Sequence, residues 1–503
     1  MKILKKWFVI SIGVLCMMMV SSNHCTVYGA SDETNVSINK TTFPDDNFRA
    51  YVKTLPGGED GVFTPKELAA IKDLTYCGTH GKNKKLKNIT GIEYFTALES
   101  IDVQENNLKE LNLEKQPFLK KVECYNNQLT TLHVPSEKLE YLSCINNKIK
   151  HLTICSKVVQ HVDCSSNQLT SITIQSPRLE ELICSFNNIA KMDVDMTSLH
   201  ALECNENALT VLSLDAPKLA YLDCSENKLS NLNCTSKKLY KVIAYDNKLT
   251  TLTMDSTIIE VLDVAKNQLK EINLNSEVLQ NLNCAENQLT TLEINYPNLT
   301  RLNCRNNQLV KLSANCPSLE SLNCAYNKLS EISLEYPNLE LLFCHHNNVS
   351  NLDISKLHNL LLLDACCNNI KQIDTSKNFM IEEIYYVPSV IEMDVRKNFD
   401  YTKVPTMAEF MFMYEDEYDI ETENLKWDRK HHSVSLLNNK NSGSLKLSDN
   451  STEYKFVFTC DQEANDNVIP ATGDQTNRFY LYGACIVAAS LLLFLIKKRR
   501  TMK

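Results

Sequence analysis

Two neighbouring pairs of residues in this chain have side chains that could support metal or redox chemistry. His345 and His346 lie about one repeat before Cys366 and Cys367, so all four are expected at the same edge of adjacent turns. Imidazole and thiolate groups are soft ligands, and four of them would suit a metal ion. The other interpretation is that they are ordinary surface and turn residues. We favour the second interpretation and predict no bound cofactor.

A loop near the N-terminus is a second candidate for chemistry. Residues 56–67 align with the calcium-binding pattern DxDxDGxxxxxE, and Asp60, Gly61 and Glu67 match positions five, six and twelve. Positions one and three are Pro56 and Gly58, which offer no side-chain oxygen, so half of the carboxylate cage is missing. We therefore predict that the segment is a polar lid on the first repeat, with a calcium site as the alternative.

A short motif near the C-terminus could be the substrate of a transpeptidase. It reads IPATG and consists of Ile469, Pro470, Ala471, Thr472 and Gly473. A polar spacer, an 18-residue apolar stretch at 479–496 and a basic tail at 497–500 follow it. An apolar stretch of that length can span a bilayer, and the positive cluster would be held on the inner side.

This three-part arrangement resembles the LPxTG sorting signal of Gram-positive surface proteins. The resemblance implies that sortase cleaves between Thr472 and Gly473 and joins Thr472 to peptidoglycan, after a transient stay in the membrane. An uncleaved single-span membrane protein is the alternative. Residues 1–30 have a basic start with Lys2, Lys5 and Lys6, then an apolar run, and small residues at the end. This order predicts a signal peptide and secretion.

The elements that position these groups are set by a repeat of 20 residues. The pattern LxxLxCxxNxLxxL returns with an asparagine at every twentieth position from Asn127 to Asn347. Flanking copies at Asn106 and Asn368 bring the total to about 14 repeats over residues 96–380. A strict period of this length is typical of a leucine-rich repeat, whose turns bury their apolar side chains by stacking. We predict a leucine-rich-repeat solenoid (horseshoe).

Each position in the repeat has a predicted role. The xLxC segment alternates with period two, which predicts a short strand, and successive strands would form a parallel sheet on the concave face. The asparagine follows the strand, where its carboxamide can satisfy backbone groups of the adjoining turn. Twenty residues leave no room for a full helix, so the convex side should be extended or 3₁₀.

The chain has 20 cysteines, and ten of them take one inward position of the repeat. Val103, Ala244, Val264 and Ala365 replace cysteine at that position, as a small buried hydrophobic residue allows. Side chains stacked in parallel also lack the geometry of a disulfide. We therefore predict free thiols that pack in the core.

The segments that flank the repeats differ in kind. Residues 31–95 are predicted to form a small helical, EF-hand-like N-terminal cap, with one helix near Phe48 and a second from Pro65 to Leu74 that begins at Thr64. Residues 381–460 alternate at 433–437 and 454–458, which predicts a β-rich C-terminal cap or module. Residues 461–503 hold the linker, the IPATG motif, the span and the tail.

The combination of signal peptide, EF-hand-like cap, asparagine ladder and sorting signal resembles the internalin-type leucine-rich-repeat surface proteins of Gram-positive bacteria. The cysteine column narrows the resemblance to the cysteine-ladder members. It covers residues 1–380 and 469–503, and it implies adhesion or host interaction through the concave sheet. The long stalk or wall-spanning modules usual after the repeats in that family are absent.

The candidate binding residues are exposed aromatic, apolar and histidine side chains on the concave sheet. They are Tyr221 and Tyr245 near the middle, and Tyr326, Leu341, Phe343, His345 and His346 near the C-terminal end. The outward column before the ladder, which includes Ser143 and Asp364, grades from acidic to neutral. The alternative is that residues 381–460 cover the C-terminal cluster.

Formal net charge is −9, and both terminal segments are basic, so the part between them is more acidic still. Such a chain is a poor match for nucleic acid. We predict a binding protein for a protein or glycan, anchored to the cell wall, and not an enzyme. The alternatives are a structural surface coat and a hydrolase formed by residues 381–460, although no nucleophile elbow, HExxH or phosphate loop is present.

Overall fold

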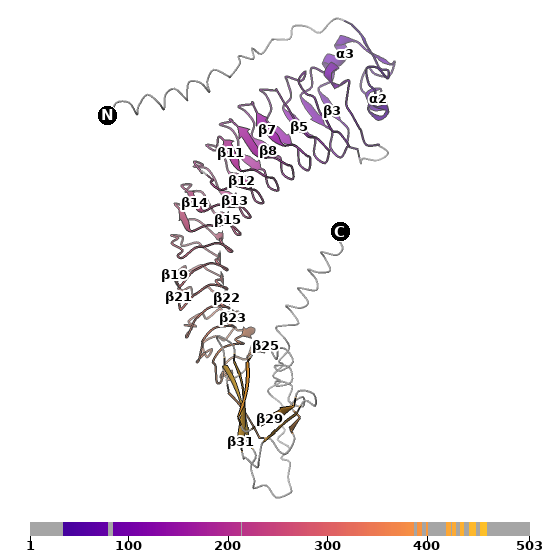
Figure 1. Ribbon diagram of the computed structural model, residues 1–503. Coiled ribbons are helices and arrows are strands. Elements are labelled where there is room, and N and C mark those ends of the chain that lie inside the picture. Colours follow the sequence, from indigo (N-terminus) through magenta and orange to yellow (C-terminus); the bar gives the residue numbers. More distant parts are fainter. Residues whose placement is uncertain are drawn as a thin grey trace, which may run out of the picture. The chain divides into compact units, whose positions relative to one another are not determined.

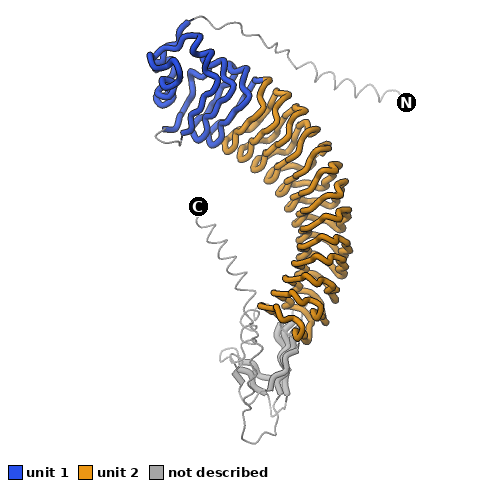
Figure 2. Tube along the Cα trace, turned by 180° about the vertical axis from the view of Figure 1, so that it is seen from behind, with its two compact units in different colours: residues 1–136 blue, residues 137–503 orange. Residues whose placement is uncertain are grey.

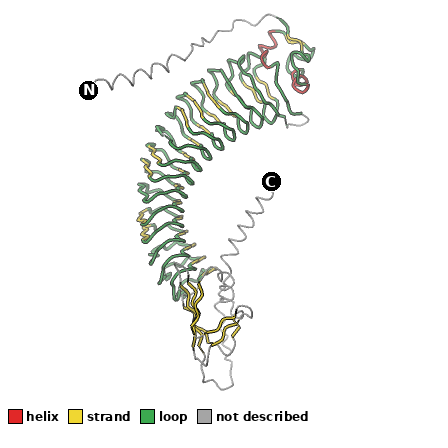
Figure 3. Tube along the Cα trace, in the orientation of Figure 1, coloured by secondary structure: helices red, strands yellow, loops and turns green. Residues whose placement is uncertain are grey.

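The computed structural model describes residues 34–78, 84–212 and 214–386, together with the backbone of seven strands between residues 390 and 459. The chain divides into two compact units, residues 1–136 and 137–503 (Figure 2). Within the described residues, the α-helices lie in the first unit, as Figure 3 shows.

The first unit contains the predicted helical cap. Helix α2 (Asp46–Val52) begins at Asp45, whose side chain accepts hydrogen bonds from two backbone N–H groups of the first turn. Helix α3 (Pro65–Ala70) begins with a capping box between Thr64 and Glu67, as the sequence predicts. Strands β1 (Val36–Ser37) and β2 (Val62–Phe63) pair antiparallel beside them.

The prediction that the second helix continues to Leu74 is wrong. Helix α3 ends at Ala70, and Leu74 is a fully buried residue of strand β3 (Asp73–Thr75). Strand β3 pairs in parallel with β4 (Ser100–Asp102), which pairs with β5 (Lys121–Glu123). The parallel sheet therefore starts inside the segment predicted as a cap, before the 3₁₀ turn η1 (Ile92–Tyr94).

The second unit continues the repeats with one short inner strand per turn. These strands pair in parallel and in register, so that each central leucine or valine meets its counterpart in the next turn. In chain order they are β6 (Tyr141–Ser143), β8 (His161–Asp163), β10 (Glu181–Ile183), β12 (Ala201–Glu203), β13 (Tyr221–Asp223), β15 (Lys241–Ile243), β17 (Val261–Asp263), β18 (Asn281–Asn283), β20 (Arg301–Asn303), β22 (Ser321–Asn323), β23 (Leu341–Phe343), β24 (Leu362–Asp364) and β25 (Glu383–Tyr385).

The outer side of the second unit is extended, one of the two conformations predicted. Figure 1 shows β12, β13, β22 and β23 on the inner side of the arc of this unit, and β14, β19 and β21 on its outer side. The outer strands form three short parallel sheets: β7 (His151–Ile154) with β9 (Ser171–Ile174) and β11 (Lys191–Val194), β14 (Asn231–Cys234) with β16 (Thr251–Met254), and β19 (Thr291–Asn295) with β21 (Lys311–Asn315).

The strands after the repeats confirm that residues 381–460 contain β-structure. Four of them form one sheet and three another. They are β26 (Val390–Asp394), β32 (Glu453–Thr459), β31 (Ser442–Ser448) and β28 (Asp419–Glu423) in the first sheet, and β27 (Phe399–Asp400), β30 (Ser433–Leu436) and β29 (Leu425–Asp428) in the second.

The asparagine ladder joins successive turns through buried carboxamides. In Asn227 the Oδ1 accepts from the N–H of Leu209 at 2.9 Å, and the Nδ2 donates to the carbonyl of Cys204 at 2.9 Å and to that of Cys224 at 3.2 Å. The residue before each ladder asparagine has a left-handed backbone, such as Glu226 with φ 52°. The predicted role of the asparagine is confirmed.

A serine column forms a second ladder, which sequence analysis missed. Ser236 donates to the carbonyl of Leu219 at 2.7 Å, and Ser256 donates to the carbonyl of Leu239 at 2.6 Å. These serines are fully buried on the side away from the inner sheet. Met196 and Ala216 occupy the same repeat position in the two turns before Ser236, so the run of serines is interrupted and its role follows only from the hydrogen bonds.

The cysteine column is buried, as predicted. Members of this column that form no disulfide and are fully enclosed include Cys164, Cys184, Cys204, Cys224, Cys284, Cys304, Cys324 and Cys344. Burial raises the pKa of the Cys284 thiol to about 12 from an ordinary value of 9.0. Thiols at this position therefore stay protonated and pack as small hydrophobic groups.

We predict that Asn227→Ala destabilises the protein strongly. The change leaves the buried N–H of Leu209 without its acceptor and removes the bond to Cys204, at about 1–3 kcal/mol for each group. The free energy of unfolding in guanidinium should fall by about 2–4 kcal/mol. The control is Asn233→Ala at an exposed position of strand β14, expected within about 0.5 kcal/mol of the wild type. Equal stability of the two variants would contradict the role of the ladder.

We also predict that stability falls as the pH rises above 9. Unfolded thiols lose their protons near pH 9, whereas the pKa of folded Cys184 and Cys284 is about 12, so deprotonation favours the unfolded chain. The stabilisation is complete below pH 9 and is lost progressively toward pH 12, by ~1.4 kcal/mol per thiol per pH unit. Guanidinium midpoints at several pH values test this. The Cys184→Ala, Cys284→Ala double variant should show a shallower dependence, and an identical slope would refute the prediction.

Candidate functional site

The inner sheet presents the side chains on either side of each central leucine. In β22 the central Leu322 is fully buried, whereas Ser321 and Asn323 are partly exposed. Two outward positions differ from the prediction. Ser143 shares its face of β6 with the much larger Tyr141 and is buried, and Asp364 lies against His345 and is also buried.

The structure brings together the predicted residues at the C-terminal end. The rings of Tyr326 and His346 stack with centroids 4.2 Å apart, and Tyr326 meets His345 edge-on at 5.1 Å. Tyr326 is 45% exposed, and Leu341 and Phe343 are partly exposed on β23. Two consecutive turns thus contribute to one group, which we call the ring cluster: Tyr326, Leu341, Phe343, His345 and His346.

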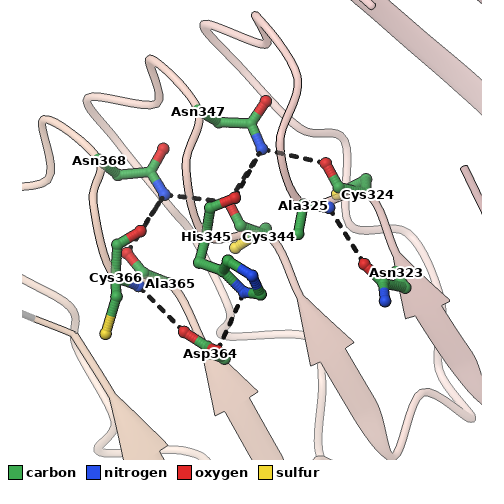
Figure 4. A network of polar contacts seen from close by, with 10 residues as sticks. All are labelled: Asn323, Cys324, Ala325, Cys344, His345, Asn347, Asp364, Ala365, Cys366 and Asn368. Carbon is green, nitrogen blue, oxygen red and sulfur yellow. Dashed lines mark hydrogen bonds and ion pairs between the residues drawn. The ribbon is translucent and has the colours of Figure 1, made fainter. Parts of the chain in front are cut away.

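A short polar contact orients His345 within the ring cluster. His345 Nδ1 lies 2.9 Å from Asp364 Oδ2, and Figure 4 shows His345 pointing toward Asp364 below the ladder asparagines Asn347 and Asn368. Tyr326 and His346 occupy the left-handed position before the ladder, with φ 54° and 53°. That backbone is restrictive for residues other than glycine, so it fixes the direction in which both rings leave the chain.

The two tyrosines near the middle belong to a different environment. The hydroxyl of Tyr245 donates to Glu226 Oε1 at 2.8 Å, which raises the pKa of Tyr245 to about 12. Lys241 Nζ lies over the Tyr221 ring, 5.1 Å from its centroid. Burial raises the pKa of Tyr221 to about 12, and the negative charge of Asp223 makes the next largest contribution. These residues lie on an acidic stretch of the sheet and are separate from the ring cluster.

Sequence analysis missed a depression on the inner sheet between these two groups. It has a volume of about 370 Å³ and is lined by outward side chains of β17, β18, β20, β22 and β23. Its distinctive members are Asn283, Asn303 and Asn323, which take the same position in three successive turns. In the sequence, these asparagines form the neutral part of the outward column. Three asparagines at one repeat position do not by themselves predict a depression.

Two carboxylate oxygens of the calcium-like loop accept hydrogen bonds within the cap. Glu67 Oε2 accepts from the backbone N–H of Thr64 at 2.7 Å and from its hydroxyl at 2.9 Å. Asp60 Oδ1 accepts from the N–H of Val62 at 3.0 Å, and Gly61 has φ +87°. The glutamate therefore serves the start of helix α3 in this structure.

The histidine and cysteine pairs have separate surroundings. His345 faces Asp364, and burial raises the pKa of Cys366 well above its ordinary value. Across the residues that the structure describes, no group of three or more histidine, cysteine, aspartate or glutamate side chains is arranged to hold a metal ion.

The predicted signal peptide, IPATG motif, membrane span and basic tail lie outside the described residues. Within the described ranges, no helix has the length and apolar character needed to cross a membrane.

Comparison with known families yields two matches. The family model for leucine-rich repeats (2 copies) matches residues 297–336, and that for the LPXTG cell wall anchor motif matches residues 461–502, which include Ile469 to Gly473. Neither is a catalytic family. No curated protein sequence matches the chain.

Solved structures share the fold. The functional domain of InlJ from Listeria monocytogenes, which includes a cysteine ladder, is 21% identical with a TM-score of 0.51, covering 86% of this chain and 100% of that one. YopM from Yersinia enterocolitica is 26% identical with a TM-score of 0.56, covering 63% of this chain and 71% of that one. YopM from Yersinia pestis is 23% identical with a TM-score of 0.50, covering 68% and 93%.

The repeat structure and these matches confirm the predicted fold, a leucine-rich-repeat solenoid. The chain shares this fold with the functional domain of InlJ, and it has a cell wall anchor motif at residues 461–502. It is secreted and anchored to the cell wall, as predicted.

We predict that Thr472→Ala prevents covalent anchoring, because sortase would have to recognise Thr472 before it attacks the carbonyl of that residue, forms an acyl bond and expels the amino group of Gly473. The fraction of protein released from washed walls by peptidoglycan digestion should fall at least tenfold, with the chain retained in the membrane or shed into the medium. The matched control is Ile469→Leu, which should remain in the wall fraction. Undiminished wall linkage of Thr472→Ala would place the cleavage elsewhere.

Proposed function

We propose that this protein is an adhesin-like binding protein that recognises a protein or glycan ligand through the concave face of its repeats. Its attachment to the peptidoglycan through sortase would hold that face outside the cell. The ring cluster is the observation that carries the proposal. Cell-wall anchoring and a leucine-rich-repeat fold support surface interaction in general, and the cluster supplies a particular place for it.

The composition of the ring cluster suits a binding surface. Large aromatic side chains dominate the energetics of protein interfaces when they can be desolvated by a partner. Tyr326 exposes 45% of its surface, and Phe343 is partly exposed beside it on the sheet. The contact of His345 with Asp364 and the restricted backbone of Tyr326 reduce the entropy that binding would cost.

Catalysis is a weaker interpretation of the same residues. A cysteine nucleophile needs a thiol with a lowered pKa near a base. Cys366 lies two residues after Asp364, which faces His345, yet burial raises the pKa of the Cys366 thiol well above its ordinary value, so the thiol stays protonated. We therefore propose binding without chemistry at this site. A structural surface coat and a hydrolase in residues 381–460 remain the alternatives that the experiment below addresses.

We predict that the triple substitution Tyr326→Ala, Phe343→Ala, His345→Ala weakens ligand binding by at least tenfold, about 1.4 kcal/mol. The chain, displayed on the wall of a Gram-positive host through its own sorting signal, would be tested against immobilised gastric mucin, fibronectin and peptidoglycan, and on epithelial monolayers. A saturable interaction of the wild type with at least one surface is expected.

The matched control carries the same residue types away from the inner strands: Tyr240→Ala, His358→Ala, Phe379→Ala. All three side chains are exposed, and Phe379 is 89% exposed. The control should bind as the wild type does. Equal loss in both variants would contradict a site at the ring cluster, and no binding by the wild type to any surface would favour a structural coat. Hydrolysis of a surface ligand by the wild type would favour the enzyme.

A further inference from the structure

The depression on the inner sheet is a built polar groove. Its lining includes Asp263 at one end, Asn281, Asn303 and Asn323 along the sheet, and Phe343 at the other end. These side chains come from strands β17, β18, β20, β22 and β23, so the groove runs across the strands. It lies beside the ring cluster and shares Phe343 with it.

The carboxamides in the groove are oriented by their own backbone. Asn303 Oδ1 accepts from the N–H of Arg305 at 3.3 Å, and Asn323 Oδ1 accepts from the N–H of Ala325 at 3.2 Å. Figure 4 shows the Nδ2 of Asn323 on the side away from Ala325. Among the described residues, neither Nδ2 has a hydrogen-bond partner, so two donors in consecutive turns are left for a ligand.

The groove also contains acceptors. Asn281 Oδ1 is buried and has no hydrogen-bond partner among the described residues. Asp263 Oδ2 accepts from Asn283 Nδ2 at 3.0 Å, which places a carboxylate next to the carboxamide row. A buried acceptor without a partner is uncommon in proteins, because it has lost water and gained nothing in return. A ligand hydroxyl would fill that need, since it can donate to one group and accept from another.

The charge of the groove excludes strongly ionic ligands. Asp263 and Arg301 have opposite charges, and the remaining polar members are asparagine and serine. Polyanions require a row of basic groups. Protein hot spots are enriched in tryptophan, tyrosine and arginine, whereas this row consists of carboxamides. An uncharged ligand rich in hydroxyl groups fits the row better than either.

The spacing of the strands adds a length requirement. Neighbouring strands lie about 4.8 Å apart, so the amides of Asn303 and Asn323 repeat at about that interval. One sugar ring of an extended chain advances by a similar distance. Each strand would then meet about one sugar, and the partly exposed ring of Phe343 would stack on the apolar face of the sugar at the end.

We propose that this groove binds an uncharged, extended glycan chain that lies across strands β17 to β23. The inference rests on the proposed function, because it names a ligand class for the same inner sheet. Its residues are different from the ring cluster except for Phe343, so the two can be separated by mutation.

The test uses the mature, wall-anchored chain, released by peptidoglycan digestion from the wall of the host that anchors it. The probes are cellohexaose, chitohexaose and maltohexaose, with a heparin hexasaccharide as the anionic comparison, and binding is measured by calorimetry. At least one neutral hexasaccharide should bind saturably and more tightly than its disaccharide. The heparin fragment should not bind.

The diagnostic variant is Asn303→Asp, Asn323→Asp. It keeps the shape and the oxygen that accepts from Arg305 or Ala325, but it replaces each outward donor by an acceptor. Affinity should fall at least tenfold. The control is Asn231→Asp, Asn233→Asp at two exposed positions of strand β14, which makes the same charge change and should bind as the wild type does. Arg301→Ser is an independent variant at an exposed groove residue and should weaken binding at least threefold.

Absence of binding to all three neutral hexasaccharides would overturn the inference, as would undiminished affinity of both groove variants. In either of these cases, if the ring-cluster variant still loses its binding to mucin, fibronectin or cells, only the glycan inference fails and the proposed function stands. If no hexasaccharide binds and the ring-cluster variant binds as the wild type does, both the glycan inference and the proposed function are overturned. Tighter binding of the heparin fragment than of every neutral probe would also overturn the ligand class proposed here.

Discussion

The buried carboxamide of each ladder asparagine is the interaction on which the repeats depend. In Asn247 the Oδ1 accepts from the N–H of Leu229 at 2.9 Å, while the Nδ2 donates to the carbonyl of Cys224 at 3.0 Å. One side chain thus pairs backbone groups of successive turns, which would each cost about 1–3 kcal/mol if left buried and unpaired. The left-handed residue before it, here Asp246, reverses the chain so that the asparagine faces inward.

A fold fixed by its inward side chains leaves the outward ones available for function. Leucine, cysteine and asparagine determine the register of each inner strand, and the residues that flank the central leucine are not needed for it. The outward column can therefore change from Asp223 through Asn303 to Phe343 while the pairing of the strands stays the same. Acidic stretch, carboxamide groove and ring cluster are three surfaces on one scaffold, which is how a repeat protein acquires a ligand without changing its fold.

Sequence analysis predicted what is periodic and missed what depends on a particular contact. The inward columns and the role of Asn227 followed from spacing, because burial in a solenoid repeats with the sequence. The end of helix α3 did not, since Leu74 suits a helix as well as a strand, and its pairing with Ile101 decides between them. Clustering of Tyr326 with His345 was foreseen from their places in the repeat. The hollow at Asn303 was not, because its depth depends on the sizes of neighbouring side chains.

The packing of the repeat core also explains how buried thiols can persist in a secreted protein. Disulfides form readily in oxidising surroundings, and the reacting species is the thiolate. Burial raises the pKa of Cys184 to about 12, so almost no thiolate exists at neutral pH, and the thiol is also closed to solvent. Cysteine can therefore serve as a small core residue in a secreted chain. Ala244 and Val264 fill the same position, which indicates that volume, and not sulfur chemistry, is what the column requires.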